Sequence, residues 1–160
     1  CRSVLGAGMA SLALAGSAVA QPLAVPVGTR ATNTAVINLA TGRTVNAWNL
    51  GTTTGEARVV LTPDGATAFV STGGGLFRLR LATADITALP VGASIDDLVL
   101  NADGTRLYVA TTTPELVVFD TGTGAEVSPR LPLAQPATRL ARAPAAGQVL
   151  VLSATPATVT

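Results

Sequence analysis

The chain has 160 residues, of which 48% are hydrophobic, 12% are charged and 3% are aromatic. This composition is typical of a globular protein and excludes a disordered or fibrous chain. His is absent and the single cysteine is Cys1, so the residues that most often ligate metals, act as thiols or transfer protons near neutral pH are scarce. The sequence therefore predicts no catalytic residue and no cofactor in this segment.

The charged residues exclude a nucleic-acid surface. All ten basic residues are Arg, nine residues are acidic, and the formal net charge is +1. A phosphate-binding surface needs clustered cations and a strongly basic balance, whereas these arginines are dispersed along the chain. We therefore expect no nucleic acid among the partners.

Residues 3–20 have the character of a secretory signal peptide. They form an uncharged run of small and apolar residues that ends in Ala18-Val19-Ala20, a small-x-small cleavage motif. An uncleaved membrane anchor is the alternative, because about eighteen apolar residues approach the lower limit for a membrane span. The abundance of Gly, Ala and Ser favours cleavage after Ala20. We expect a helical signal peptide at 1–20, a linker at 21–32, and a secreted or periplasmic product with no membrane attachment after cleavage.

A repeat follows this leader. Residues 59–65 (VVLTPDG) recur as residues 98–104 (LVLNADG), and Phe69-Val70 corresponds to Tyr108-Val109 at the same offset of 39 residues. A third, degraded start lies at residues 140–152. A period of about 40 residues is typical of repeat architectures, in which each repeat is one supersecondary unit.

Each repeat is predicted to contain four short strands. Asp-Gly between two apolar runs is a strong hairpin signal, and the frequent Gly and Pro exclude long helices after residue 20. Asp64 and Asp103 are therefore expected to be turn residues. The expected strands of the two full repeats are 58–61, 68–71, 76–81 and 86–89, followed by 98–100, 107–111, 116–120 and 126–128.

Three segments of the repeats carry a family resemblance. They are residues 62–70 (TPDGATAFV), residues 101–109 (NADGTRLYV) and residues 118–124 (VFDTGTG). These segments resemble the YVTN-type bacterial β-propeller repeat. The resemblance implies an all-β fold, a β-propeller fragment of three to four four-stranded antiparallel blades preceded by the helical signal peptide.

The expected propeller region is incomplete. It consists of a blade tail at 33–50, blades at 51–92 and 93–134, and a partial blade at 135–160. Propellers typically have four to eight blades, and a partial arc leaves apolar blade faces uncovered. We therefore expect the remaining blades to come from further sequence or from another chain.

The candidate ligand-binding residues are Arg58, Asp96, Asp97, Glu115 and Arg139. Asp96 and Asp97 are adjacent carboxylates, and Glu115 is expected to approach them if the propeller resemblance places their loops on one face. Aligning the repeats gives Arg58, Asp97 and Arg139 the same position, so the resemblance implies a group of alternating charges at the mouth of the central channel. Such a group either binds an ionic ligand or pairs neighbouring blades, and two cations beside Asp97 favour blade pairing.

Two functions are compatible with these patterns. The resemblance implies an exported repeat scaffold that binds a protein, a surface polymer or a small ligand at its loop face. The alternative is the N-terminal part of a propeller enzyme, such as a lactonase-like hydrolase or a quinone- or haem-dependent oxidoreductase, with its catalytic groups in other blades. The fold alone does not decide between them, because one fold hosts many functions.

Overall fold

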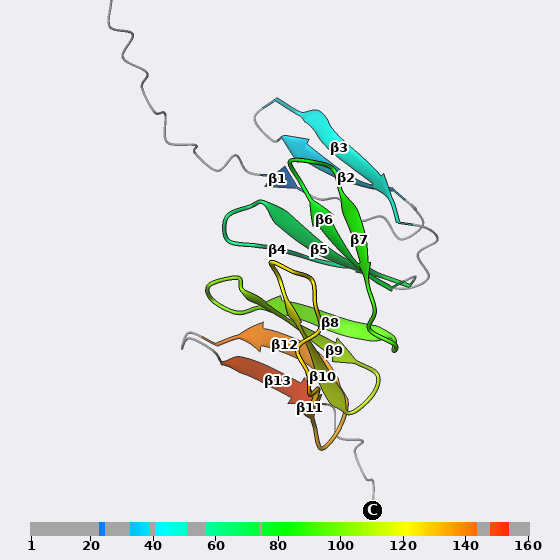
Figure 1. Ribbon diagram of the computed structural model, residues 1–160, viewed down its shortest axis with the longest axis vertical. Coiled ribbons are helices and arrows are strands. Elements are labelled where there is room, and N and C mark those ends of the chain that lie inside the picture. Colours follow the sequence, from blue (N-terminus) through cyan, green and yellow to red (C-terminus); the bar gives the residue numbers. More distant parts are fainter. Residues whose placement is uncertain are drawn as a thin grey trace, which may run out of the picture.

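The structure of the protein is a computed structural model, drawn as a ribbon in Figure 1. It describes residues 23–24, 33–38, 41–50, 57–73, 75–143 and 148–153. Within these ranges the chain forms thirteen β-strands and no helix. The signal peptide expected at residues 1–20 and its cleavage site lie outside the described residues.

The strands form four antiparallel sheets that follow one another in chain order (Figure 1). We call them the N-terminal sheet and the first, second and third blades. The N-terminal sheet contains β1 (Leu23–Ala24), β2 (Asn33–Asn38) and β3 (Arg43–Asn49). The first blade contains β4 (Arg58–Leu61), β5 (Thr67–Thr72), β6 (Gly75–Arg80) and β7 (Ile86–Leu89). The second blade contains β8 (Ile95–Leu100), β9 (Arg106–Thr111), β10 (Glu115–Asp120) and β11 (Leu131–Pro132), and the third contains β12 (Ala137–Arg142) and β13 (Val149–Ser153).

The first blade matches the predicted strands closely. Its four strands pair in sequence order, and each one overlaps its predicted range. The repeat therefore identified both the number of strands and their order, because the Asp-Gly turns and the apolar alternation fix where each hairpin reverses.

The second blade differs from the prediction at its outer strand. A strand was expected at 126–128, but that stretch contributes only a bridge between Phe119 and Glu126 and a hydrogen bond from the Val127 amide to the Val118 carbonyl. The outer strand β11 instead begins at Leu131. Pro129 interrupts the pairing because proline has no N–H to donate to a strand ladder.

The Asp-Gly turns are closed by the side chains that the sequence singled out. Asp64 accepts hydrogen bonds from the Thr62 hydroxyl (2.6 Å) and the Ala66 amide (2.9 Å). Asp103 accepts hydrogen bonds from the amide and the hydroxyl of Thr105 at 3.0 and 2.7 Å. Each turn then reaches the left-handed region at its glycine. The structure therefore places both aspartates in the turn role that was predicted for them.

The hydrophobic core consists of layers between successive sheets. The largest layer lies between the first and second blades and contains Phe69 and Leu76 on one side and Leu107, Val109 and Phe119 on the other. A second layer joins Trp48 of β3 to the first blade, and a smaller one joins Ala110 and Leu116 of the second blade to Ala137 of the third. Side chains alternate between the two faces of each strand, so a central blade contributes to the layers on both sides.

None of the described segments is a helix with the length and apolar character needed to cross a membrane.

The first two blades also meet closely at their Asp-Gly turns. A Cβ atom built on Gly104 would lie 2.2 Å from Cδ of Pro63, whereas a Cβ on Gly65 would meet no atom within 4 Å. Both glycines have positive φ angles, +73° and +66°. The two positions therefore share the same backbone strain and differ in the contact with the neighbouring blade.

We predict that Gly104→Ala destabilises the protein more than Gly65→Ala. Both substitutions introduce left-handed strain of about 1–2 kcal/mol, and Gly104→Ala adds about 1–3 kcal/mol because Pro63 must move. Urea denaturation of the two variants measures the difference in the free energy of unfolding. Equal losses would show that the contact between the two turns does not limit blade packing.

Candidate functional site

The inner strands of the three blades lie side by side. β8 packs against β4 on one side and against β12 on the other. Arg58, Asp97 and Arg139 occupy the same place in these strands, because the next residue of each strand makes an equivalent pair with the second strand of its blade. These pairs are Val59 with Val70, Leu98 with Val109 and Leu140 with Val151. The alignment of the repeats therefore corresponds to an alignment in space.

Asp97 connects all three blades. Its side chain is buried, with 9% of the residue exposed. Oδ1 accepts a hydrogen bond from the Leu98 amide (3.0 Å) and lies 3.9 Å from Nε of Arg58 in the first blade. Oδ2 accepts a hydrogen bond from the Leu140 amide of the third blade at 2.8 Å. The carboxylate thus pairs blades, which is the role that the charge alternation favoured.

Two other candidate residues, Arg139 and Asp96, differ from Asp97. Arg139 is exposed and its Nη1 donates a hydrogen bond to the carbonyl of Thr138 (2.8 Å). The ion-pair contact of Asp97 in the described part of the chain is with Arg58. Asp96 is the extra residue of a β-bulge between Ile95 and Asp97, and it is half-buried. The bulge interrupts the strand alternation and separates the roles of two adjacent carboxylates.

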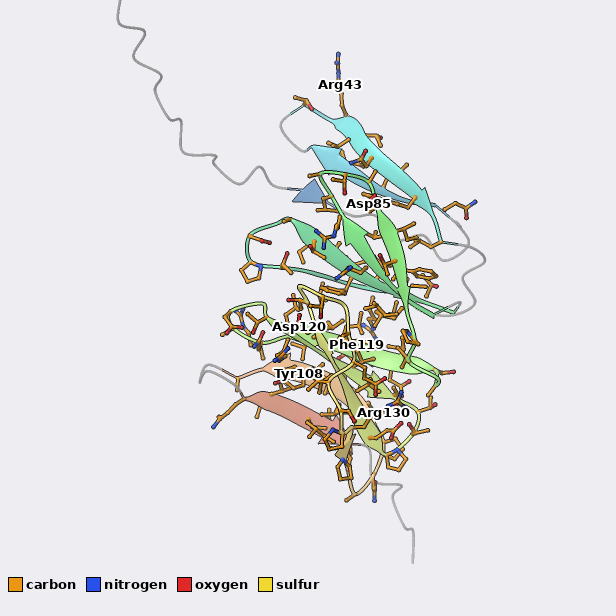
Figure 2. All side chains as sticks on the ribbon, in the orientation of Figure 1. Arg43, Asp85, Tyr108, Phe119, Asp120 and Arg130 are labelled. Carbon is orange, nitrogen blue, oxygen red and sulfur yellow. The ribbon has the colours of Figure 1, made fainter. Side chains whose placement is uncertain are left out.

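Glu115 belongs to a cluster of charged side chains around Arg130. Arg130 lies at its centre and donates hydrogen bonds to Glu115 Oε1 (2.6 Å), to both carboxylate oxygens of Glu126 (2.7 and 3.2 Å) and to the Val91 carbonyl (2.9 Å). Figure 2 shows Arg130 and Asp120 at opposite ends of β10. Glu115 starts β10 at the same end of the second blade at which Asp96 and Asp97 start β8, because β8, β9 and β10 pair antiparallel.

The sequence analysis missed Arg130 because no local pattern marks it. Its contacts depend on the break at Pro129, which carries the chain back beside the start of β10. The Val91 carbonyl belongs to the connection between the first and second blades, so Arg130 also holds that connection. The only sequence signal is the spacing of four residues between Glu126 and Arg130, which outside a helix carries little information.

Electrostatics in this cluster favour the charged forms. The hydrogen bond from Arg130 lowers the pKa of Glu126 below its ordinary value of 4.5, with a smaller Coulombic contribution. The hydrogen bonds from Glu126 and Glu115 raise the pKa of Arg130. Both carboxylates are partly exposed, so the cluster is screened by solvent and contributes modestly to stability.

A groove opens at the other end of the blades. Its volume is about 340 Å³, and it lies between the β4–β5 turn of the first blade, the β8–β9 turn of the second blade and the start of the turn after β10. The residues that line it are Thr62, Pro63, Asp64, Thr67, Asp103, Gly104, Thr105, Thr121 and Gly122.

The floor of this groove is fixed by contacts between the blades. Nη1 of Arg78, a buried residue of β6, donates hydrogen bonds to the carbonyls of Thr121 (3.4 Å) and Gly122 (3.0 Å). The Thr121 hydroxyl donates to the Gly104 carbonyl at 2.6 Å. Hydrogen bonds therefore join three segments that are distant in sequence at this groove.

The groove is rich in hydrogen-bond acceptors. Hydrogen bonds from the Thr62 hydroxyl and the Ala66 amide lower the pKa of Asp64. Hydrogen bonds from the Thr105 amide and hydroxyl lower the pKa of Asp103. Both carboxylates are thus ionised at neutral pH, and none of the nine lining residues is basic. Among the described residues no group of three or more Asp, Glu, His or Cys side chains could hold a metal ion.

No protein-family model and no curated protein matches the chain. Solved structures do. Dihydro-haem d1 dehydrogenase NirN in complex with DHE is similar over 81% of this chain and 29% of that chain, with a TM-score of 0.70 and 16% identity. The β-propeller domain of Cps50 (Swd1) from Myceliophteria thermophila is similar over 78% of this chain and 44% of that chain, with a TM-score of 0.61 and 17% identity. The chain has a β-propeller fold.

Hydrazine synthase from Kuenenia stuttgartiensis is also similar, over 58% of this chain and 27% of that chain, with a TM-score of 0.51 and 20% identity. The chain therefore spans less than half the length of each of these structures. Structural similarity at identities this low shows that the fold is shared. It does not show a shared function, because one fold hosts many functions.

We predict that Asp97→Ala lowers the free energy of unfolding by about 1–3 kcal/mol, because the Leu140 amide loses its acceptor at a blade interface. Asp96→Ala is the matched control, since it removes the adjacent carboxylate, and we expect it to cost less than about 0.5 kcal/mol. Chemical denaturation of both variants tests this. A similar loss for the two variants would show that Asp97 does not pair the blades.

We predict that stability falls as the pH drops below about 4.5, the ordinary pKa of Glu126. A carboxyl group whose pKa is lowered by folding stabilises the protein fully above its unfolded pKa, and this contribution is lost as the pH falls through the folded pKa. Glu126→Gln and Arg130→Gln should each reduce the dependence, and the double variant should reduce it no further. Thermal unfolding between pH 3 and 7 provides the measurement, and additive effects would contradict the pairing.

Proposed function

We propose that the chain is an exported β-propeller scaffold that binds a protein, a surface polymer or a small ligand through loops at the ends of its blades. We further propose that its repeats are of the YVTN type, on the support of residues 62–70, 101–109 and 118–124. The proposal rests on the groove between the first two blades, where the repeat brings equivalent turns together and lines the space between them with polar groups.

The side chains of the groove favour a particular ligand chemistry. Asp64 and Asp103 offer ionised carboxylate oxygens, and four threonines in the lining add hydroxyl groups. Such a surface suits a ligand that donates several hydrogen bonds, such as a saccharide or a basic peptide. An anionic ligand would meet two negative charges and no cation of the lining.

Charged side chains at the end of the blades opposite the groove also support the proposal of a binding scaffold. Asp97, Arg130, Glu115 and Glu126 hold neighbouring segments together, as their hydrogen bonds and ion pairs show. Charged groups that are engaged in this way stabilise the loops at their own end of the blades, opposite the groove. Rigid loops lower the entropy that is lost when a ligand binds.

Binding to arrays of neutral glycans and of basic peptides tests the proposed ligand chemistry. We expect a ligand from one of these arrays to lose at least about tenfold in affinity in the variant Asp64→Asn/Asp103→Asn, because two charge-assisted acceptors are removed. Asp85→Asn is the matched control. Asp85 accepts a hydrogen bond from Thr83 in another turn (2.6 Å) and is not part of the groove lining.

Two outcomes would contradict the groove as the binding site. One is the absence of any binding by the folded protein on either array. The other is a ligand whose affinity falls equally in the groove variant and in the Asp85 control. Circular dichroism of each variant must first show that the fold is retained.

Export rests on residues 3–20 and on the motif Ala18-Val19-Ala20. Mass spectrometry of protein from the periplasm or the medium of a bacterial host should give Gln21 as the first residue. Retention of the leader in the membrane fraction would favour an anchor instead.

A second candidate function is the N-terminal part of a propeller oxidoreductase. Its support is the likeness in fold to NirN, a dehydrogenase of dihydro-haem d1, over 81% of this chain. In this case the catalytic groups would lie in other blades. An optical spectrum of protein purified from its natural host separates the two functions, because a bound haem absorbs strongly in the visible region.

A further inference from the structure

Two of the six aspartates in the sequence precede a glycine. They are Asp64 in the β4–β5 turn and Asp103 in the β8–β9 turn. Glycine has no side chain to hinder its main-chain nitrogen, so this nitrogen can approach the carboxyl carbon of the preceding aspartate. The attack is intramolecular and closes a succinimide ring, which opens to aspartate or to isoaspartate. Asp-Gly pairs are therefore the positions at which such a rearrangement of the main chain is expected first.

Hydrogen bonds within the two turns do not distinguish the two aspartates. Each carboxylate accepts a hydrogen bond from the amide two residues ahead, at 2.9 Å for Asp64 and 3.0 Å for Asp103. Each also accepts one from a threonine hydroxyl, at 2.6 and 2.7 Å. Each glycine amide donates to the carbonyl of the residue that begins its turn, at 2.8 Å for Gly65 and 3.1 Å for Gly104. The two Asp-Gly pairs thus start from nearly the same local geometry.

The surroundings of the two glycines do differ. Gly104 is buried, a Cβ atom built on it would lie 2.2 Å from Cδ of Pro63, and its carbonyl accepts a hydrogen bond from the Thr121 hydroxyl at 2.6 Å. Gly65 is half-buried, and a Cβ atom built on it would meet no atom within 4 Å. Ring closure moves the glycine nitrogen and Cα toward the carboxyl group. Pro63 and Thr121 oppose this movement at Gly104, whereas Gly65 has open space.

We propose that Asp64-Gly65 is a site of spontaneous isoaspartate formation, and that the packing of the two blades protects Asp103-Gly104 from the same reaction. The Gly65 nitrogen forms a bond to Cγ of Asp64, and the hydroxyl of the protonated carboxyl group leaves as water with the amide proton. A water molecule then adds to the main-chain carbonyl carbon of Asp64 and breaks its bond to the Gly65 nitrogen. The chain now continues through Cβ and Cγ of residue 64, and its mass is unchanged.

The rearrangement alters one wall of the groove. It adds one carbon to the main chain of the β4–β5 turn and leaves the former main-chain carbonyl as a free carboxylate. The turn is closed by hydrogen bonds from the Gly65 amide to the Thr62 carbonyl and from the Ala66 amide to Asp64. Their geometry depends on the spacing of an ordinary peptide chain. Asp64 lines the groove, but the reaction does not depend on what the groove binds and is tested without a ligand.

Ageing of the folded protein at physiological temperature and pH tests the proposal. Peptide mapping by liquid chromatography and mass spectrometry separates isoaspartate from aspartate at equal mass, and endoproteinase Asp-N cleaves before aspartate only. We expect isoaspartate to accumulate at least about tenfold faster at residue 64 than at residue 103, because the opening of the second turn also breaks a hydrogen bond and a packing contact with the neighbouring blade.

Two controls separate blade packing from local sequence. The first is the same protein unfolded in urea, in which we expect the two rates to become similar. The second is a matched pair of variants in the turn after β10. Thr121→Val removes the hydroxyl that holds the Gly104 carbonyl and should speed the reaction at Asp103. Thr123→Val removes a hydroxyl that donates to Asp120 instead, and it should leave both rates unchanged.

Equal rates at the two sites of the folded protein, or a faster reaction at Asp103, would overturn the proposal. The absence of isoaspartate at residue 64, under conditions in which the unfolded chain accumulates it, would overturn it too. A difference between the sites that persists in urea would assign the cause to local sequence and contradict protection by the blades. A rate at Asp103 that does not rise in Thr121→Val, or that rises equally in Thr123→Val, contradicts the role of the Gly104 contact.

Discussion

The apolar layers between successive sheets are the constraint on which the rest of this structure depends. Each blade has two faces to bury, and the layer around Phe69 and Phe119 forms only when the second blade covers the first. Burial of one such side chain contributes about 1.5–3 kcal/mol, so the layers outweigh any single ion pair of this structure. Stability therefore belongs to pairs of blades, as expected for repeat proteins.

Polar contacts determine the orientation of the segments that these apolar layers bring together. The hydrophobic effect has no direction, whereas the hydrogen bonds of Asp97, Arg78 and Arg130 fix how one segment lies against the next. Asp97 acts at the inner strands, and Arg78 and Arg130 act toward the outer strands and the connections. At the groove, the hydrogen bonds of Arg78 join the turn after β10 to the first blade.

The repeat in the sequence was sufficient to predict the β-propeller fold, the strands of the first blade and the shared position of Arg58, Asp97 and Arg139. These features follow from local patterns: apolar alternation, Asp-Gly turns and a constant spacing. The cluster of Arg130 and the late start of β11 were not predictable in this way, because they depend on how a proline-interrupted segment folds back on β10. The groove was missed for the same reason, since its walls come from two blades and its floor is held by Arg78.

Because Asp97 accepts a hydrogen bond from a main-chain amide of the next blade, this contact does not depend on the side chain of its partner residue. Its Oδ2 binds a backbone amide of the third blade, and every residue except proline carries such an amide. The side chain at position 140 can therefore change without loss of this hydrogen bond. Neighbouring repeats are free to drift apart in sequence while their main chains stay in the same register, which agrees with a third repeat that has lost Asp-Gly from its turn and still aligns at its inner strand.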